Sequence, residues 1–401
     1  FLPLSEYSDL LIIHDDFGFI YMSKNMKMEE FVAGNLKQQF EYSSFEPNIV
    51  NLQWNWDSPK INTRLEKASR ALAELNAFSL IVPDIDLFIY MHVLKEASQS
   101  SKIEGTQTHI DDVILDISQI DPEKRDDWQE VRNYVQAMSE SIHELRTLPL
   151  SVRLLKSTHK ILMQGVRGEH KTPGEFRISQ NWIGGTSLGD AVFVPPHHDN
   201  LPEMMSDLEK LWHNESINVP ELIRIAISHY QFETIHPFLD GNGRIGRLLI
   251  TLFLINRKIL AKPSLYLSDY LEKNRSDYYD ALTKVRNSND LVHWVIFFLD
   301  AVIETAENSK KTFEKIMSLR SELEAQMVML GRRAENARKL LLHLYKAPAV
   351  NGGTVAQLLD VTPRAANGLI NEFIRLNILE EITGYQRNRM FLFRKYIQLF
   401  R

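Results

Sequence analysis

The chain has 401 residues, of which 44% are hydrophobic and 24% are charged. This length exceeds one typical core, so two or three domains are expected, and the apolar content excludes disorder as a description of the whole chain. The absence of Cys excludes disulfide scaffolds, thiolate zinc sites, iron–sulfur clusters and Cys nucleophiles.

The net charge of −6 is unevenly distributed. From Arg332 to Arg401 there are 12 Lys and Arg against 5 Asp and Glu, a net charge of +7, which leaves −13 for the rest of the chain. An acidic body and a basic tail indicate separate domains. The apolar runs are far shorter than the roughly 18 residues that span a bilayer, and no signal-peptide pattern is present, so we expect a cytoplasmic protein. The chain begins at Phe1, and Met22 is the first of three candidate natural starts.

Apolar residues recur at helical spacing through most of the first 330 residues, which predicts a mainly α body. Gly105 stands where a glycine C-cap closes a helix. The segment 172–196 differs, because its turn formers and β-formers predict a hairpin around a Gly-rich turn. The predicted helices cover residues 60–76, 86–104, 108–118, 125–146, 151–166, 201–213, 220–235, 244–257, 275–287, 290–306 and 307–330.

The tail has the order helix, helix, helix, hairpin, which is typical of a winged helix-turn-helix. Helices are predicted over 335–345, 354–359 and from Pro363 to about Leu376, where Thr362 is the N-cap and proline takes the first helical position. Short strands are expected over 378–382 and 390–393.

The segment His236–Arg247, with the sequence HPFLDGNGRIGR, carries the chemistry. Pro237 ends one helix, and the Gly-Asn-Gly turn lets successive backbone N–H groups converge at the start of the next helix, which is an anion-binding arrangement. Arg244 and Arg247 are three residues apart and both reach toward such an anion. Asp240 offers oxygen ligands for Mg²⁺, and His236 is placed to remove a proton from a hydroxyl. Each feature alone is usually structural, but their joint occurrence in twelve residues is specific.

This segment resembles the Fic signature, His-Pro-Phe-x-(Asp/Glu)-Gly-Asn-Gly-Arg-x-x-Arg, at every fixed position. The resemblance implies a protein adenylyltransferase, which moves AMP from ATP to a hydroxyl of a target protein. It implies that His236 is the general base, that Asp240 binds Mg²⁺ and that Arg247 holds the γ-phosphate, while Phe238 anchors the loop. The nucleotide contacts expected here are Asp240, Gly241, Asn242, Gly243, Arg244, Ile245, Gly246 and Arg247.

The hairpin over 177–196 resembles the Fic flap, which clamps the target and lines the nucleotide pocket. Trp182, Ile183 and Gly184 would face the nucleotide. Tyr278 and Tyr279 match a family segment that holds the adenine, although a pair of interfacial aromatics explains them equally well.

The segment Ser100–Gly105, SSKIEG, matches the Fic inhibitory motif, (Ser/Thr)-x-x-x-Glu-(Gly/Asn). Ser100 and Glu104 are one helical turn apart, and Gly105 ends the helix. In the family this Glu pairs with the second Arg of the signature, here Arg247. We expect a bidentate pair that misaligns the phosphates of ATP, with the inhibitory helix N-terminal to the Fic core in the same chain.

Two other features of the sequence suggest further binding sites. The sequence His197-His198-Asp199 suggests a metal site, but polar loop histidines explain it better from sequence alone. The basic tail suggests DNA binding, although winged helices also dock proteins. Its candidate DNA contacts are Arg364, Asn367, Asn371, Arg375, Arg387, Arg389, Arg394 and Lys395.

The predicted organisation is an N-terminal helical region (1–149) with the inhibitory helix at about 86–105, a Fic domain (150–305), a helical linker (306–331) and a winged helix (332–401). The predicted function is protein adenylylation with ATP and Mg²⁺, autoinhibited by Glu104. The alternatives are a DNA-binding regulator in which the Fic core senses a nucleotide, and a Fic enzyme that removes AMP. Self-modification and a homodimer are further expectations, and the target protein and its modified residue stay open.

Overall fold

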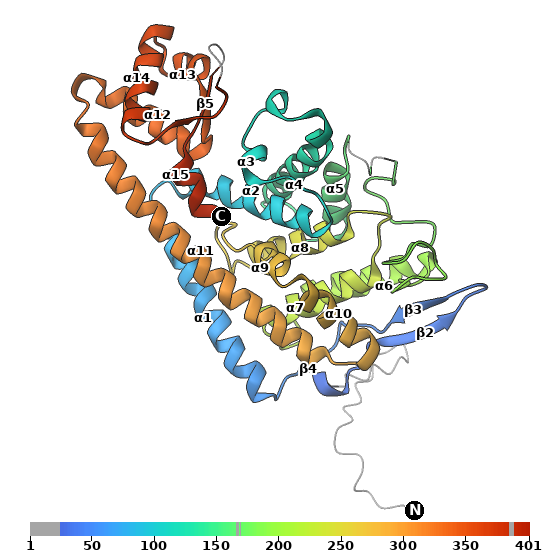
Figure 1. The fold of residues 1–401 in the computed structure, drawn as a ribbon. Coiled ribbons are helices and arrows are strands. Elements are labelled where there is room, and N and C mark those ends of the chain that lie inside the picture. The colour runs from blue at the N-terminus through green and yellow to red at the C-terminus, as the bar shows by residue number, and fades with distance from the viewer. Residues whose placement is uncertain (1–24, 166–167, 169, 385–388) are drawn as a thin grey trace, which may run out of the picture.

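The computed structural model describes residues 25–165, 168, 170–384 and 389–401, and it is mainly helical as predicted (Figure 1). Within these residues, no helix is both long and apolar enough to cross a membrane. The α-helices are α1 (Pro59–Ile81), α2 (Ile85–Ile103), α3 (Ile110–Val113), α4 (Arg125–Glu144), α5 (Val152–Leu162), α6 (Leu201–His213), α7 (Glu221–Ile235), α8 (Asn242–Asn256), α9 (Ser268–Lys273), α10 (Arg275–Ser288), α11 (Leu291–Val328), α12 (Ala334–Lys346), α13 (Gly352–Leu359), α14 (Pro363–Arg375) and α15 (Arg394–Ile397). The strands are β1 (Met26–Lys27), β2 (Gly34–Gln38), β3 (Ser43–Pro47), β4 (Trp54–Asn55), β5 (Ala349–Asn351), β6 (Glu380–Glu381) and β7 (Met390–Leu392).

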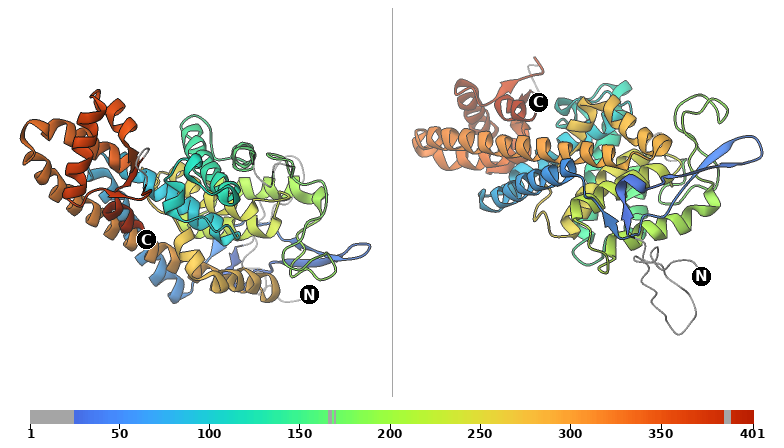
Figure 2. Two further views of the ribbon diagram at one scale, coloured as in Figure 1. Left: turned by 45° about the horizontal axis from the view of Figure 1, so that its top comes forward. Right: turned by 90° about the horizontal axis from the view of Figure 1, so that it is seen from below.

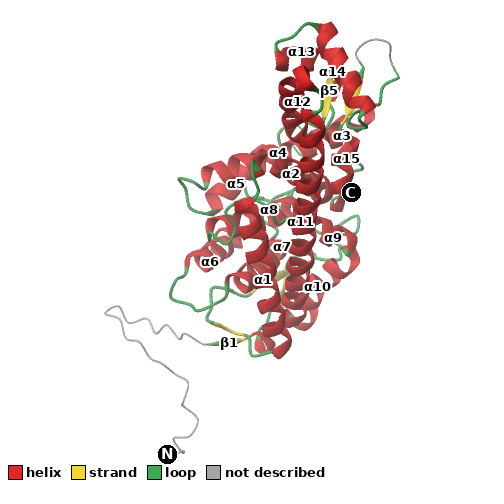
Figure 3. Cartoon of the chain, turned by 90° about the vertical axis from the view of Figure 1, so that its left-hand side faces the viewer, coloured by secondary structure: helices red, strands yellow, loops and turns green. Residues whose placement is uncertain are grey.

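The centre of the body is formed by α7 and α8, which are buried over almost their whole length. α8 is mostly apolar, and the polar side chains of α7, among them Arg224, His229 and Glu233, are buried as well, so neighbouring elements cover both helices on all sides. Residues 248–254 of α8 are all buried, as their mostly apolar sequence indicates. The long α11 runs beside α1 along one side of the body and continues to the C-terminal unit (Figures 2 and 3).

The structure differs from the predicted elements in several places. The helices expected over 290–306 and 307–330 are one helix, α11, because neither Gly nor Pro interrupts the chain there. The helix expected over 108–118 stops at Val113, since Asp116 accepts a hydrogen bond from the Ser118 N–H and starts a separate turn. The hairpin formed by β2 and β3 was not predicted, because β2 is mostly exposed and neither strand shows a clear apolar alternation.

The flap segment, defined as residues 177–196, contains a single bridge, between Ile183 and Phe193, where a longer hairpin was predicted. The N–H groups of Val192 and Phe193 both donate to the Ile183 carbonyl, which bulges the exit arm and ends the ladder. The exit arm pairs instead with β3, since the Phe45 N–H donates to the Val194 carbonyl.

The C-terminal unit contains α12, α13 and α14 and a three-stranded sheet in the order β5–β7–β6. This agrees with the predicted order of elements and adds the unpredicted strand β5. Its aromatic side chains pack on α2. The ring of Phe88 lies edge-on to Tyr345 at 5.2 Å and near Tyr396, and the ring of His92 lies 4.9 Å from Phe400.

Ion pairs extend this seam between the C-terminal unit and the body. Asp111 of α3 pairs with Arg394 at 3.0 Å and also with Arg401. Part of the positive charge of the tail therefore binds the acidic body.

Replacing Phe88, which is fully buried in this seam, should destabilise the fold strongly. We expect Phe88→Ala to lower the free energy of unfolding by about 3–5 kcal/mol, because it leaves a cavity among aromatic rings. Leu80→Ala on the exposed face of α1 is the control and should change stability by less than about 0.5 kcal/mol. Urea unfolding of both variants measures the difference, and equal effects would contradict the seam.

Candidate functional site

The loop between α7 and α8 holds most of the predicted site residues. α7 ends at Ile235, and its C-cap residue His236 has a left-handed backbone, with a φ of 50° and a ψ of 59°. The His236 N–H donates to the Phe232 carbonyl. Gly241 has a φ of 74°, and α8 begins at the next residue. These two reversals turn the chain sharply, so that the loop and the first N–H groups of α8 face the same space.

Asn242 fixes this loop from the inside. Its Oδ1 accepts the Phe238 N–H and its Nδ2 donates to the Phe238 carbonyl, both at 2.8 Å. Asn181 of the flap segment donates to the same carbonyl at 2.9 Å. The side chain of Asn242 thus holds the loop, which leaves its backbone N–H for a ligand. Phe238 is fully buried, and its predicted anchoring of the loop is confirmed.

His159 of α5 also holds this loop in place, and this role was not predicted from the sequence. Its ring stacks on Phe238 at 3.9 Å. Nδ1 accepts the Gly174 N–H, so Nε2 carries the proton and donates to the Asp240 carbonyl at 3.0 Å. Burial lowers the pKa of His159 to about 4, which keeps the ring neutral and this tautomer in place.

A carboxylate already lies at the predicted anion-binding turn. A Cβ at Gly243 would be 2.3 Å from Oε1 of Glu104, so the glycine leaves room for this carboxylate at the N-terminus of α8. A helix N-terminus favours negative charge. Glu104 therefore occupies the kind of position that a phosphate would take.

Arg247 is buried and turns toward α2. Its Nη2 donates to Oε1 of Glu104 at 2.6 Å and to the Ser100 carbonyl, while Nε donates to the Ser100 hydroxyl. The carboxylate contact is thus a single hydrogen bond, where a bidentate pair was expected, and Nε and Nη2 also donate to Ser100. Burial is the largest influence and acts to raise the pKa of Glu104, but the charge of Arg247, its hydrogen bond and the charge of Arg244 together hold that pKa below its ordinary value.

Gly105 has a φ of 102° directly after this carboxylate, which supports its predicted role in ending the helix. Arg244 donates from Nη1 to Glu130 of α4 at 3.2 Å, and its Nη2 lies 3.7 Å from Oδ1 of Asp240, so it stays beside the loop. Ile245 is fully buried, and Gly246 packs against Glu233 of α7, so both belong to the packed core.

His236 lies at the rim of the turn, partly exposed. Burial and then the charge of Arg177 lower the pKa of His236 to about 4, so its imidazole is neutral near pH 7 and can accept a proton. Asp240 is near this ring in sequence and its side chain is 47% exposed. A half-exposed carboxylate beside an anion-binding turn fits Mg²⁺, which takes one or two carboxylates together with phosphate oxygens.

Arg177, at the start of the flap segment, is a second residue that sequence reasoning missed. Its buried guanidinium donates to the carbonyls of His236, at 3.0 Å, and of Pro196, at 2.6 Å. Arg177 thereby connects both ends of the flap segment to the loop between α7 and α8. Beyond it, Trp182 is 40% exposed, Ile183 is half-buried and Gly184 has a φ of 69°.

The two predicted tyrosines separate. Tyr278 is buried and its hydroxyl donates to Nε2 of His229, whose Nδ1 donates to the Gly246 carbonyl, so Tyr278 is part of the core. Tyr279 is 38% exposed, and the charges of Glu104 and Arg247 both act on its hydroxyl. Only Tyr279 of this pair is open toward the site.

The basic residues of the tail are partly neutralised. Within the described residues, Arg375 pairs with Glu372, Arg389 with Glu381, and Arg394 with Asp111 and Glu380. Arg364, Asn367 and Asn371 are exposed on α14, as DNA contacts would need. Arg387 lies outside the described residues.

The structure is thus a helical fold in which a sharply turned loop joins two buried helices, α7 and α8. Residues 62–143 match the family model described as Fic/DOC family N-terminal, and residues 149–254 match that of the Fic/DOC family. The chain therefore contains a Fic/DOC domain, as the signature predicted.

Known proteins agree with this assignment. Proteins named "Protein adenylyltransferase Fic" are 30% identical over 172 residues in Drosophila erecta and 32% identical over 158 residues in Drosophila grimshawi. The matches cover 43% and 39% of this chain but only 30% and 28% of those relatives.

Two solved structures share the fold. A Fic family protein from Desulfovibrio desulfuricans G20 has a TM-score of 0.52 and 21% identity, and the match covers 84% of this chain and 96% of that one. A Fic domain containing signaling protein from Bacteroides thetaiotaomicron has a TM-score of 0.50 and 18% identity, with 63% and 97% covered.

Glu233 predicts a pH dependence of stability. Burial raises the pKa of Glu233 from 4.5 to about 7. Between these values the folded chain holds a proton that the unfolded chain releases, so stability falls as the pH rises through this window. Glu233→Gln should remove this fall and should stabilise the protein above pH 7 by roughly 3 kcal/mol.

Unfolding midpoints measured across this pH window test the assignment. Glu307→Gln, a change of the same chemistry at an exposed position of α11, is the control and should leave the profile unchanged. Parallel profiles for wild type and Glu233→Gln would disprove the role of this carboxyl.

Proposed function

We propose that this protein is an adenylyltransferase that moves AMP from ATP to a hydroxyl of a target protein. The observation that carries the proposal is the turn at the N-terminus of α8, which has a buried arginine, Arg247, on one side and a neutral histidine, His236, at its rim. Anion binding and proton removal are the two requirements of nucleotidyl transfer to a hydroxyl. The names of the curated relatives support the same reaction.

In this reaction the hydroxyl oxygen attacks the α-phosphorus, its proton goes to the imidazole of His236, and the bond to pyrophosphate breaks. The backbone N–H groups at Gly241–Gly243 stabilise the charge on the phosphates, and Arg247 binds the γ-phosphate once Glu104 has left it. Asp240 would hold Mg²⁺, which supplies further charge neutralisation on the phosphates. Tyr279 and Trp182 would contact the base and its surroundings.

The flap segment supports a protein as the substrate. Ile178 and Val192 are 81% and 77% exposed, beside the partly exposed Trp182. Apolar side chains grouped on a surface are typical of protein contacts. An extended segment of the target would lie along this arm and present its hydroxyl to His236.

We further propose that Glu104 inhibits the enzyme. The contact of its carboxylate with both Gly243 and Arg247 supports this, because ATP needs the same two groups for its phosphates. Removal of AMP is the alternative use of this carboxylate, which would then orient a water molecule. DNA binding by the C-terminal unit is less favoured, since several of its basic residues pair with nearby acids.

His236→Ala should abolish incorporation of label from ATP, since loss of a general base typically costs about 10²–10⁴-fold. His143→Ala, at an exposed histidine of α4, is the control and should keep full activity. Gel autoradiography of the protein incubated with labelled ATP measures this. Undiminished labelling in His236→Ala would refute the assignment of the base.

Glu104→Gly should increase self-labelling, because it frees Arg247 and empties the turn at Gly243. Lys102→Ala, two residues earlier on α2, is the control for changes in this part of the helix and should not activate. Mass spectrometry of the Glu104→Gly variant after incubation with ATP and Mg²⁺ identifies the group that is added. The inhibitory role fails if both variants label like the wild type.

A further inference from the structure

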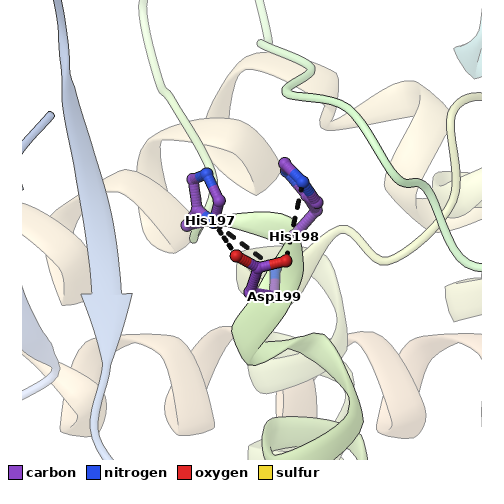
Figure 4. A group of neighbouring side chains, drawn as sticks. All are labelled: His197, His198 and Asp199. Carbon is purple, nitrogen blue, oxygen red and sulfur yellow. Dashed lines mark hydrogen bonds and ion pairs between the residues drawn. The ribbon is translucent and has the colours of Figure 1, made fainter. Parts of the chain in front are cut away.

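A group of potential metal ligands directly follows the flap segment. His197, His198 and Asp199 follow the rigid Pro195-Pro196 pair and form the turn that leads into α6 (Figure 4). Sequence alone favoured polar loop histidines here. In the structure, one ligand atom from each side chain lies within 4.8 Å of the other two.

The distances are close to those of a coordinated ion. Nδ1 of His197 is 3.4 Å from Oδ2 of Asp199, and Nε2 of His198 is 3.7 Å from Oδ1 of Asp199. Ligand atoms about 2.0–2.1 Å from a tetrahedral zinc ion are roughly 3.4 Å apart. Small side-chain rotations therefore bring all three residues to one ion.

The three side chains are also partly exposed and make few hydrogen bonds. The side chains of His197 and His198 are 28% and 27% exposed, and that of Asp199 is 78% exposed. The hydrogen bond from the Asp199 N–H to Nδ1 of His197 is long, at 3.4 Å, so a metal bond replaces little. Nδ1 of His198 is buried and has no partner among the described residues, so no hydrogen bond fixes this ring.

We propose that His197, His198 and Asp199 bind a zinc ion, with water in the remaining position. Two imidazoles and one carboxylate are a zinc donor set, whereas Mg²⁺ prefers oxygen ligands alone. The proposal does not depend on the reaction at His236.

The surroundings give the ion a mechanical role. The His197 N–H and the Asn200 amide both donate to Glu46 of β3, and the Pro196 carbonyl accepts from Arg177. An ion here would join the exit of the flap segment, β3 and the start of α6. It would stiffen the arm against which a target protein lies.

Calorimetric titration of the full chain, without an affinity tag and after removal of metals with a chelator, tests the site. We expect the wild type to bind one equivalent of Zn²⁺ in preference to Mg²⁺. His198→Ala and Asp199→Asn should each weaken binding by at least about tenfold, because each removes a direct ligand. His143→Ala removes an exposed histidine outside the group and should bind like the wild type.

A thermal unfolding scan keeps the test independent of any folding defect. Zn²⁺ should raise the Tm of the wild type and of His143→Ala, and it should not raise that of Asp199→Asn, which has nearly the same shape as the wild type. The proposal is overturned if the wild type binds no Zn²⁺, if Mg²⁺ binds more tightly, or if His198→Ala and His143→Ala bind alike.

Discussion

A buried guanidinium must be neutralised, and this requirement organises the body of the protein. Arg247 is 2% exposed, its Nε and Nη2 donate to Ser100 and Glu104 at the end of α2, and the charge of Glu104 lies beside it. An unpaired charge at such a depth would cost several kcal/mol. The N-terminal helices and the central pair α7 and α8 are thus held together by the same side chain that the proposed reaction needs.

The loop that carries the chemistry is held by buried polar side chains. Asn242 satisfies both backbone groups of Phe238, His159 fixes the Asp240 carbonyl in one tautomer, and Arg177 ties the flap segment to the carbonyl of His236. Each contact satisfies a buried backbone group that would otherwise lack a partner. The site is therefore preorganised, and its own residues provide much of that order.

Sequence predicted the helices and the signature well, because apolar spacing and short motifs are local. It predicted the approach of Glu104 to Arg247 only through resemblance to a family. It missed His159, Arg177 and Glu233, since a lone polar residue in an amphipathic segment gives no sign of what it will contact after folding. It also read one bulged flap as a hairpin, because bulges depend on which strand, here β3, lies alongside.

The helix α2 has two tasks at its two ends. Its 19 residues form a rod about 28 Å long, whose first turns lie under the aromatic rings of the C-terminal unit and whose last turn carries the residues that bind Arg247. A rod transmits displacement better than a loop does. One continuous helix therefore connects the packing surface of the C-terminal unit with the carboxylate over Gly243.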